Sequence, residues 1–313
     1  MFKTIIDLYT KTFVVWVILF GILAYFVPEP FLAVKGGMTW FFALTMFGIG
    51  VALEPADFQR IAKQPWLVLV GSIAQFTIMP FGAFAIAYLF QLPQELAIGL
   101  ILTGSAPGAM ASNVMSYIAK ADAAYSVSLT TVSTLACPIL TPGLTYLLAG
   151  ADMDVDFFKM MNDIMIMVIY PLLAGFVIRY LFKSYIEKMI FIFPAISSTF
   201  IIFIGTIVVA SNHNYLPQIT GIILVIVLLL NVYGMAAGYG VGHLFKMELK
   251  RKRALAIEIG MQNAGLGTVL ALQHFGERAA APAALFVFVC IITASILAEW
   301  WSGRGSIIYT ESN

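Results

Sequence analysis

The sequence predicts an all-α membrane protein with ten transmembrane helices. Three observations support this fold class: 61% of the 313 residues are hydrophobic, only 11% are charged, and the charges separate long uncharged stretches. A soluble domain has about 25% charged residues, whereas a helix needs about 20 largely apolar residues to cross a bilayer. The formal net charge of +1 gives no basic surface for a phosphate backbone. The composition therefore predicts a lipid bilayer and no nucleic acid as partner, and it excludes an ordinary cytosolic enzyme.

The uncharged stretches give the predicted spans in chain order. Five lie in the first half of the chain, at residues 12–28, 36–53, 64–94, 96–119 and 123–151. The sixth, 164–178, is short, so Lys159 and Asp163 must lie at its interfacial start. The stretch 189–245 divides into two spans at the turn-forming residues 211–217. The last two spans are 254–276, which contains one charge, and 279–298. Lys3 and Lys11 before the first stretch resemble a secretory signal, but no small-residue cleavage site follows, so we expect a first span there.

Basic residues predict the orientation of these spans. If the N-terminus is cytoplasmic, 14 lysines and arginines lie inside and three, Lys35, Lys159 and Arg278, lie outside. The positive-inside rule then places both termini in the cytoplasm, in a multi-pass protein of the inner (plasma) membrane. The acidic run 152–156 falls outside, where we expect a solvated loop rather than a metal site.

Five spans before that loop and five after it predict two inverted repeats, residues 1–150 and 151–313. An odd number of spans makes the second half enter the membrane with opposite polarity. Transporters built in this way bind their substrates near the midplane, between the repeats. Span four should then correspond to span nine.

Span four contains helix-breaking residues in its middle. Gly104, Pro107 and Gly108 lie within five positions, and each disfavours a continuous helix. Ser112 and Asn113 follow, and both are strong N-cap residues. A half-helix that restarts there would direct its positive end into the membrane centre. The alternative is a proline-kinked helix whose small residues serve packing.

Span nine contains Glu258, the one acidic residue that we place well inside a span. An intramembrane charge costs at least about 3 kcal/mol, and the sequence offers no intramembrane lysine or arginine to neutralise it. A proton or a bound cation must do so. Gln262 and Asn263 supply amide oxygens, and Gly260 and Gly265 permit local unwinding that exposes carbonyl oxygens, the hard ligands that an alkali cation prefers. The alternative is a neutral glutamic acid hydrogen-bonded within a tight bundle.

Further oxygens lie in neighbouring spans. Ser126 and Thr130 in span five are four residues apart and share one helix face, and Gln75 lies in the middle of span three. An intramembrane hydroxyl by itself ordinarily bonds to its own helix. These residues become candidate ligands only if they lie beside Glu258.

The sequence resembles the bile acid:sodium symporter family over essentially its whole length. The resemblance depends on Ala-Ser-Asn-Val-Met at 111–115, on Ser126 and Thr130, on Ile-Glu-Ile-Gly-Met-Gln-Asn-Ala-Gly-Leu at 257–266, and weakly on residues 46–53. It implies a panel of spans one, two, six and seven against a core of spans three to five and eight to ten. It also implies that spans four and nine are broken and cross each other.

The resemblance implies two sodium sites and a neighbouring substrate site. The first sodium would bind Ser112, Asn113, Ser126, Thr130 and Glu258. The second would bind Gln75, Glu258 and Gln262, with the carbonyls of Ile259 and Met261. Substrate would lie near Asn113, Asn263 and Ala264, and Ala264 replaces a serine frequent in the family, so no hydroxyl contact is expected there.

We therefore expect a sodium-coupled symporter that imports an organic anion by alternating access, with two sodium ions as coupling ions and no cofactor. The anion stays open between a bile acid-like amphipath and a small carboxylate such as pantoate or a 2-oxo acid. The alternative is proton coupling or cation/proton antiport through Glu258. An enzyme is not expected, since the sequence has no HExxH motif, no Gly-x-Ser-x-Gly elbow and no paired intramembrane aspartates.

Overall fold

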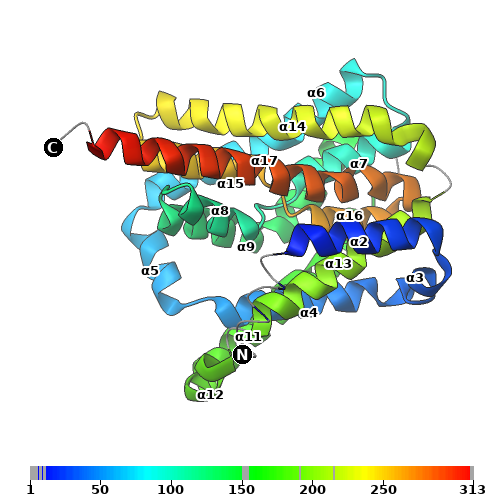
Figure 1. Ribbon diagram of the computed structural model, residues 1–313, viewed down its shortest axis with the longest axis horizontal. Helices are drawn as coiled ribbons and strands as arrows, with labels where there is room; N and C mark the ends of the chain where they lie inside the picture. Colours follow the sequence, from blue (N-terminus) through cyan, green and yellow to red (C-terminus); the bar gives the residue numbers. More distant parts are fainter. Residues whose placement is uncertain are drawn as a thin grey trace.

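The computed structural model describes residues 6, 9, 12–149, 155–189, 192–213 and 216–310, and these residues form helices joined by short connections. Most of the long helices run along a common axis (Figure 1). The described residues contain no strand, and their one isolated bridge joins Gly108 to Gln262. The all-α prediction is confirmed for this part of the chain. Of the predicted acidic loop 152–156, residues 152–154 lie outside the described residues.

The first half of the chain contains eight described α-helices. They are α2 (Phe13–Phe26), α3 (Glu29–Ala33), α4 (Met38–Ala52), α5 (Pro55–Lys63), α6 (Pro65–Leu89), α7 (Gln94–Ser105), α8 (Ala111–Ile118) and α9 (Ala123–Ala149), with a 3₁₀ turn, η1 (Lys35–Gly37), before α4. The second half contains α10 (Phe157–Ile164), a π-helical turn η2 (Met165–Ile169), α11 (Tyr170–Leu181), α12 (Lys183–Met189), α13 (Phe193–Asn212), α14 (Leu216–Leu244), α15 (Leu249–Gly260), α16 (Ala264–His274) and α17 (Glu277–Thr310).

Six helical segments of the described residues are long and apolar enough to cross a membrane. They are Pro65–Leu89, Ala123–Ala149, Phe157–Leu181, Ala195–Asn212, Gly221–Leu244 and Glu277–Gly303. A seventh is added if Lys35–Ala52 and Pro55–Lys63, bent by 76° from each other, count as one span. The chain is thus a multi-pass membrane protein. The larger count of ten spans in two inverted repeats, 1–150 and 151–313, stays a prediction.

Span six begins earlier than the predicted 164–178, because α10 already starts at Phe157. Asp156 caps this helix by accepting a hydrogen bond from the Lys159 amide at 2.9 Å. Asp163 lies 3.0 Å from His274 of α16, so the polar residues at the start of the helix have partners. Lys159 and Asp163 thus lie in the first two turns of this helix, at the start of the span, where the sequence analysis places them.

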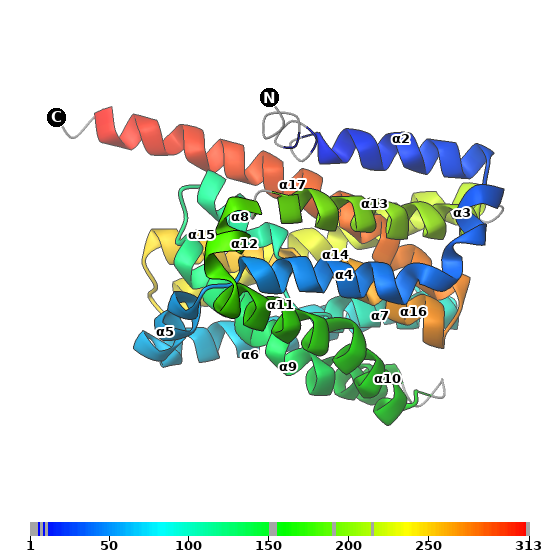
Figure 2. The ribbon, with the colours of Figure 1, turned by 90° about the horizontal axis from the view of Figure 1, so that it is seen from below.

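Glycines allow close packing between helices of the two halves. A Cβ atom on Gly50 of α4 would lie 2.0 Å from the Leu172 carbonyl oxygen, and one on Gly175 of α11 would lie 2.2 Å from that of Phe47. Helix α4 also packs against α13, and α13 packs against α2. Figure 2 shows α4, α11 and α13 on one side of the molecule, with α6, α7, α9 and α16 beyond them. The division into a panel and a core domain remains a proposal.

Candidate functional site

Spans four and nine are each broken in their middle, and the two breaks face each other. The Ala109 amide donates to the Met261 carbonyl at 2.8 Å, and the Asn263 amide donates to the Pro107 carbonyl at 2.7 Å. An unpaired backbone group in a bilayer costs several kcal/mol, so irregular backbone there needs partners from the protein. Each break supplies the partners of the other. The two broken helices therefore cross with their unwound segments in direct contact.

The half-helix after the first break has its N-cap two residues before the first predicted cap, Ser112. Helix α8 begins at Ala111 with Met110 as N-cap, and no side chain caps it. Ser112 and Asn113 lie in its first turn instead, which leaves their side chains available for other contacts. In span nine, Asn263 is the N-cap of α16, and its Oδ1 accepts a hydrogen bond from the Leu266 amide at 3.2 Å. The interpretation of Ser112 and Asn113 as caps was wrong.

The Glu258 carboxylate is buried at the crossing and is held by hydroxyl groups. Glu258 is only 1% exposed. Its Oε2 accepts hydrogen bonds from Ser112 Oγ at 2.5 Å and Ser126 Oγ at 2.8 Å, and its Oε1 accepts one from Thr130 Oγ1 at 2.6 Å. Among the ion pairs of the described residues, none involves Glu258. The charge of this carboxylate has hydroxyl donors around it and no basic partner.

The five residues predicted for the first sodium site lie together around this carboxylate. Asn113 joins the cluster through its Oδ1, which accepts a hydrogen bond from Thr130 Oγ1 at 3.2 Å. Gly108 leaves room for the carboxylate, since a Cβ atom there would lie 2.2 Å from Glu258 Oε1. The atoms that converge here are carboxylate, hydroxyl and amide oxygens, which suit a hard cation. That a sodium ion binds them stays a prediction.

The residues predicted for the second sodium site also lie together. Gln75 of α6 donates through Nε2 to Gln262 Oε1 at 2.8 Å, and Gln262 Nε2 donates to the Ile259 carbonyl at 2.8 Å. Gln75 and Gln262 are 2% and 1% exposed. Gln75 Oε1 is buried without a hydrogen-bond partner among the described residues. Because an unpaired buried acceptor is costly, this oxygen is a suitable cation ligand.

The predicted substrate residues differ in their burial. Asn113 and Asn263 are half-buried, whereas Ala264 is 2% exposed. Both asparagines lie in the first turn or at the cap of a half-helix, α8 or α16, whose N-terminus points toward the crossing. Positive dipole ends of this kind favour an anion. That substrate contacts these residues stays a prediction.

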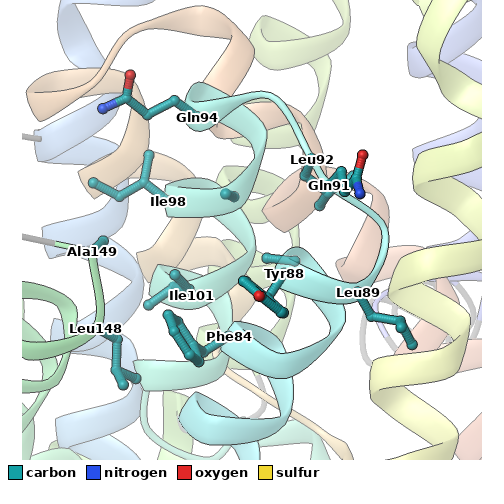
Figure 3. A pocket seen from close by; sticks show the side chains of 12 residues that line it. Phe84, Tyr88, Leu89, Gln91, Leu92, Gln94, Ile98, Ile101, Leu148 and Ala149 are labelled. Carbon is teal, nitrogen blue, oxygen red and sulfur yellow. The ribbon is translucent and has the colours of Figure 1, made fainter. Parts of the chain in front are cut away.

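A pocket of about 690 Å³ lies elsewhere, between the ends of α6, α7 and α9. Its lining includes Gln91 and Gln94 near one end of the view in Figure 3, and Phe84, Ile101 and Leu148 nearer the other. It contains none of the predicted site residues and no charged side chain. The crossing, where charge and converging oxygens coincide, is therefore the candidate site.

The sequence analysis missed three residues that support the breaks. Ser133 Oγ accepts a hydrogen bond from the Gly108 amide at 3.2 Å. Asn231 donates to the Gly260 carbonyl at 2.8 Å and accepts from Thr293 at 2.7 Å. An asparagine within the apolar stretch 189–245 was a usable signal for Asn231, since a polar residue inside a span needs a partner.

Comparison with known proteins gives consistent matches. The sodium bile acid symporter family matches residues 39–219. A Bacillus subtilis protein named "Uncharacterized sodium-dependent transporter YocS" is 39% identical over 294 residues, which cover 94% of this chain and 92% of the relative. The rice protein "Probable sodium/metabolite cotransporter BASS2, chloroplastic" is 34% identical over 310 residues, or 97% of this chain and 73% of the relative. The Arabidopsis thaliana protein of the same description, BASS1, is 32% identical over 294 residues, or 93% and 73%. These relatives are named as transporters rather than enzymes.

Proposed function

Because this chain belongs to the sodium bile acid symporter family, we propose that it imports an organic anion together with sodium ions. The observation that supports this most directly is the buried Glu258 carboxylate, which three hydroxyls contact and no basic side chain of the described residues pairs with. A charge in this position must be neutralised. We assign that role to sodium.

The first sodium ion binds at the Glu258 cluster. Each hydroxyl that now donates to the carboxylate also has lone pairs, so rotation about its C–O bond turns it into a cation ligand. Helices α8, α9 and α15 provide these groups, with Ser112 and Asn113 on α8 and Ser126 and Thr130 on α9. The cation thereby links the half-helices α8 and α15 to α9.

The second sodium ion binds on the other side of Glu258, at the break of span nine. Its ligands are Gln75, Gln262, Glu258 and the carbonyls of Ile259 and Met261. The unpartnered Gln75 Oε1 supports this assignment, because a cation would supply its missing interaction.

Charge balance gives the substrate class. Two sodium ions and one glutamate leave a local charge of about +1, and the N-termini of α8 and α16 add positive potential. An organic anion beside Asn113 and Asn263 neutralises this charge. If the anion is monovalent, each cycle moves one net positive charge, worth about 2.3 kcal/mol per 100 mV. The size of the anion, from a small carboxylate to a bile acid-like amphipath, is part of the test below.

Transport proceeds by alternating access, in which a panel (spans one, two, six and seven) and a core (spans three to five and eight to ten) move relative to each other. The protein lies in an inner membrane with both termini cytoplasmic. Besides apolar packing, four polar side-chain contacts between described residues join these two groups of helices, and these four involve segments predicted at the outer end. They are Lys35–Glu277, Asn212 with the Glu277 carbonyl, Gln273–Thr39 and His274–Asp163. We infer that they close the outer side while the inner side is accessible.

The test uses the purified full chain in proteoliposomes at fixed pH, with sodium or potassium outside. A thermal-shift screen of organic anions first selects the substrate, because a true ligand stabilises more when sodium is present. Glu258→Ala should abolish sodium-dependent uptake, whereas Glu299→Gln, a change at an exposed glutamate of α17, should not. Undiminished uptake by Glu258→Ala refutes the assignment. Uptake that persists in potassium and follows a pH gradient indicates proton coupling instead.

A further inference from the structure

One asparagine of α14 lies at the point where span nine breaks. Asn231 is completely buried, at 0% exposure. Its Nδ2 donates to the carbonyl of Gly260, the last residue of α15, at 2.8 Å. Its Oδ1 accepts a hydrogen bond from Thr293 Oγ1 of α17 at 2.7 Å. Three helices therefore meet in one short chain of hydrogen bonds at the break.

The direction of this chain is fixed by chemistry. The Gly260 carbonyl can only accept, so the amide nitrogen of Asn231 must face it and the amide oxygen must face Thr293. The Gly260 carbonyl thus sets the orientation of the Asn231 amide. The single proton of the Thr293 hydroxyl is shared between the Asn231 oxygen at 2.7 Å and the Val289 carbonyl of its own helix at 2.8 Å, so Thr293 supports the Asn231 side chain in this orientation.

The packing of α14 against α15 leaves little freedom at this point. Gly234 and Gly238 lie three and seven residues after Asn231, on the same helix face. A Cβ atom on Gly234 would lie 3.1 Å from the Ile259 carbonyl oxygen, and one on Gly238 would lie 2.8 Å from that of Leu255. The backbone of α14 therefore lies directly against the carbonyl groups of α15, and Asn231 supplies the donor for the final one.

We propose that Asn231, supported by a hydrogen bond from Thr293, is a positioning residue for the second sodium site. The Gly260 carbonyl lies between the Ile259 and Met261 carbonyls that we assign to this ion. A peptide group held at Gly260 limits rotation of both neighbouring peptide groups, so the ligand oxygens point in fixed directions before the cation binds. This inference rests on the proposed function.

The mechanism predicts an effect on sodium rather than on stability alone. When Asn231 is replaced by leucine, the Gly260 carbonyl has no donor and its flanking peptides can rotate away from the cation. Loss of a hydrogen bond that orients a metal ligand lowers metal affinity by about tenfold or more. A purely structural role would lower the melting temperature equally with and without sodium.

The experiment measures thermal unfolding of the purified full chain as sodium chloride replaces choline chloride at constant ionic strength. Asn231→Leu should raise the sodium concentration for half-maximal stabilisation by about tenfold. Thr293→Val should raise this sodium concentration less, and Thr293→Ser, which keeps the hydroxyl, should leave it at the wild-type value. Thr145→Val is the matched control, because Thr145 is a buried threonine of α9 that donates only to the carbonyl of Thr141, at 2.7 Å.

An unchanged sodium midpoint in both Asn231→Leu and Thr293→Val overturns the inference, even if their melting temperatures fall. If Asn231→Leu does not fold, the sodium midpoint of Thr293→Val alone tests the inference, because valine has nearly the same volume as threonine and Asn231 is retained. If wild-type protein shows no stabilisation by sodium, the proposed function fails and this inference fails with it. Wild-type stabilisation with unaltered variants overturns only the positioning role.

Discussion

Replacement of Gly108 by alanine tests the candidate site without changing any proposed ligand. A Cβ atom at this position would lie 2.2 Å from Glu258 Oε1 and 3.0 Å from its Cδ. A carbon and an oxygen that are not bonded require a separation larger by about 1 Å. The obstructing atom is the end of a side chain rather than backbone, so the carboxylate can withdraw. We expect Gly108→Ala to fold with its carboxylate displaced.

The displacement gives the magnitude of the effect. A hard cation lies about 2.4 Å from a carboxylate oxygen. At an effective dielectric constant of about 20, the attraction of the two charges is about 7 kcal/mol at that distance and about 5 kcal/mol when they are about 1 Å farther apart. The difference of about 2 kcal/mol corresponds to about a thirtyfold loss of sodium affinity.

Sodium titrations of thermal unfolding and of uptake measure this loss. The matched control is Gly143→Ala in α9, where the new Cβ atom would lie 3.7 Å from the Phe157 ring, an ordinary contact. Gly108→Ala should shift the sodium midpoint in both titrations and Gly143→Ala in neither. If Gly108→Ala binds sodium like the wild type, the carboxylate oxygen next to Gly108 is not a sodium ligand and the reasoning fails.

Three further changes test the packing, the outer contacts and the second site. Gly99→Ala would place a Cβ atom 1.9 Å from the Ala279 carbonyl oxygen, so we expect a loss of about 1–3 kcal/mol in stability, seen as a lower melting temperature at every sodium concentration. Lys35→Glu should slow uptake by repelling Glu277, now 2.5 Å away, and the double variant with Glu277→Lys should recover it, with little change in stability because the pair is partly exposed. Gln75→Leu should lower the Hill coefficient for sodium toward one, because it removes one of the proposed ligands of the second ion.

Each of these changes has a control in the same chain. Gly205→Ala enters open space and should leave the melting temperature unchanged. Lys183→Glu, in an exposed pair of α12 with 3.8 Å between its charged atoms, should not affect uptake. Thr77→Val, on an exposed face of α6, should leave the Hill coefficient unchanged. The packing prediction is contradicted if Gly99→Ala is as stable as the wild type. The prediction for the outer contacts is contradicted if uptake does not recover in the charge-swapped double variant. The second-site prediction is contradicted if Gln75→Leu leaves the sodium Hill coefficient unaltered.

The breaks in spans four and nine were predictable because their causes are local. Pro107 and Gly108 lie next to each other and both disfavour a continuous helix, and α7 does end at Ser105. The partner of Asp163 at the start of span six was not predictable in this way. Asp163 contacts His274, which is more than a hundred residues away in the chain. A pattern that counts charges cannot distinguish a paired one from a solvated one.

In the candidate site too, features with a local cause were predictable from the sequence and features that depend on distant contacts were not. Glu258 was identified from the sequence because an intramembrane carboxylate is conspicuous whatever surrounds it. The shared helix face of Ser126 and Thr130 did not by itself make them ligands, and their assignment came from the family resemblance. The room that Gly108 leaves for the Glu258 carboxylate and the hydrogen bond from Thr293 to Asn231 were not identified. Both depend on contacts with Glu258 and Asn231 that only the packed helices create.

A carboxylate shared by two proposed cation sites has a consequence for coupling. If the first sodium ion neutralises Glu258 as we propose, the second ion enters a site with no remaining negative charge, where its own charge is poorly solvated. An anion at the N-termini of α8 and α16 supplies the compensation that the protein lacks. The second cation and the anion should therefore each bind weakly alone and tightly together, and by linkage each should increase the affinity of the other by the same factor. Transport of one without the other is then suppressed by charge balance at the crossing, without any additional gate.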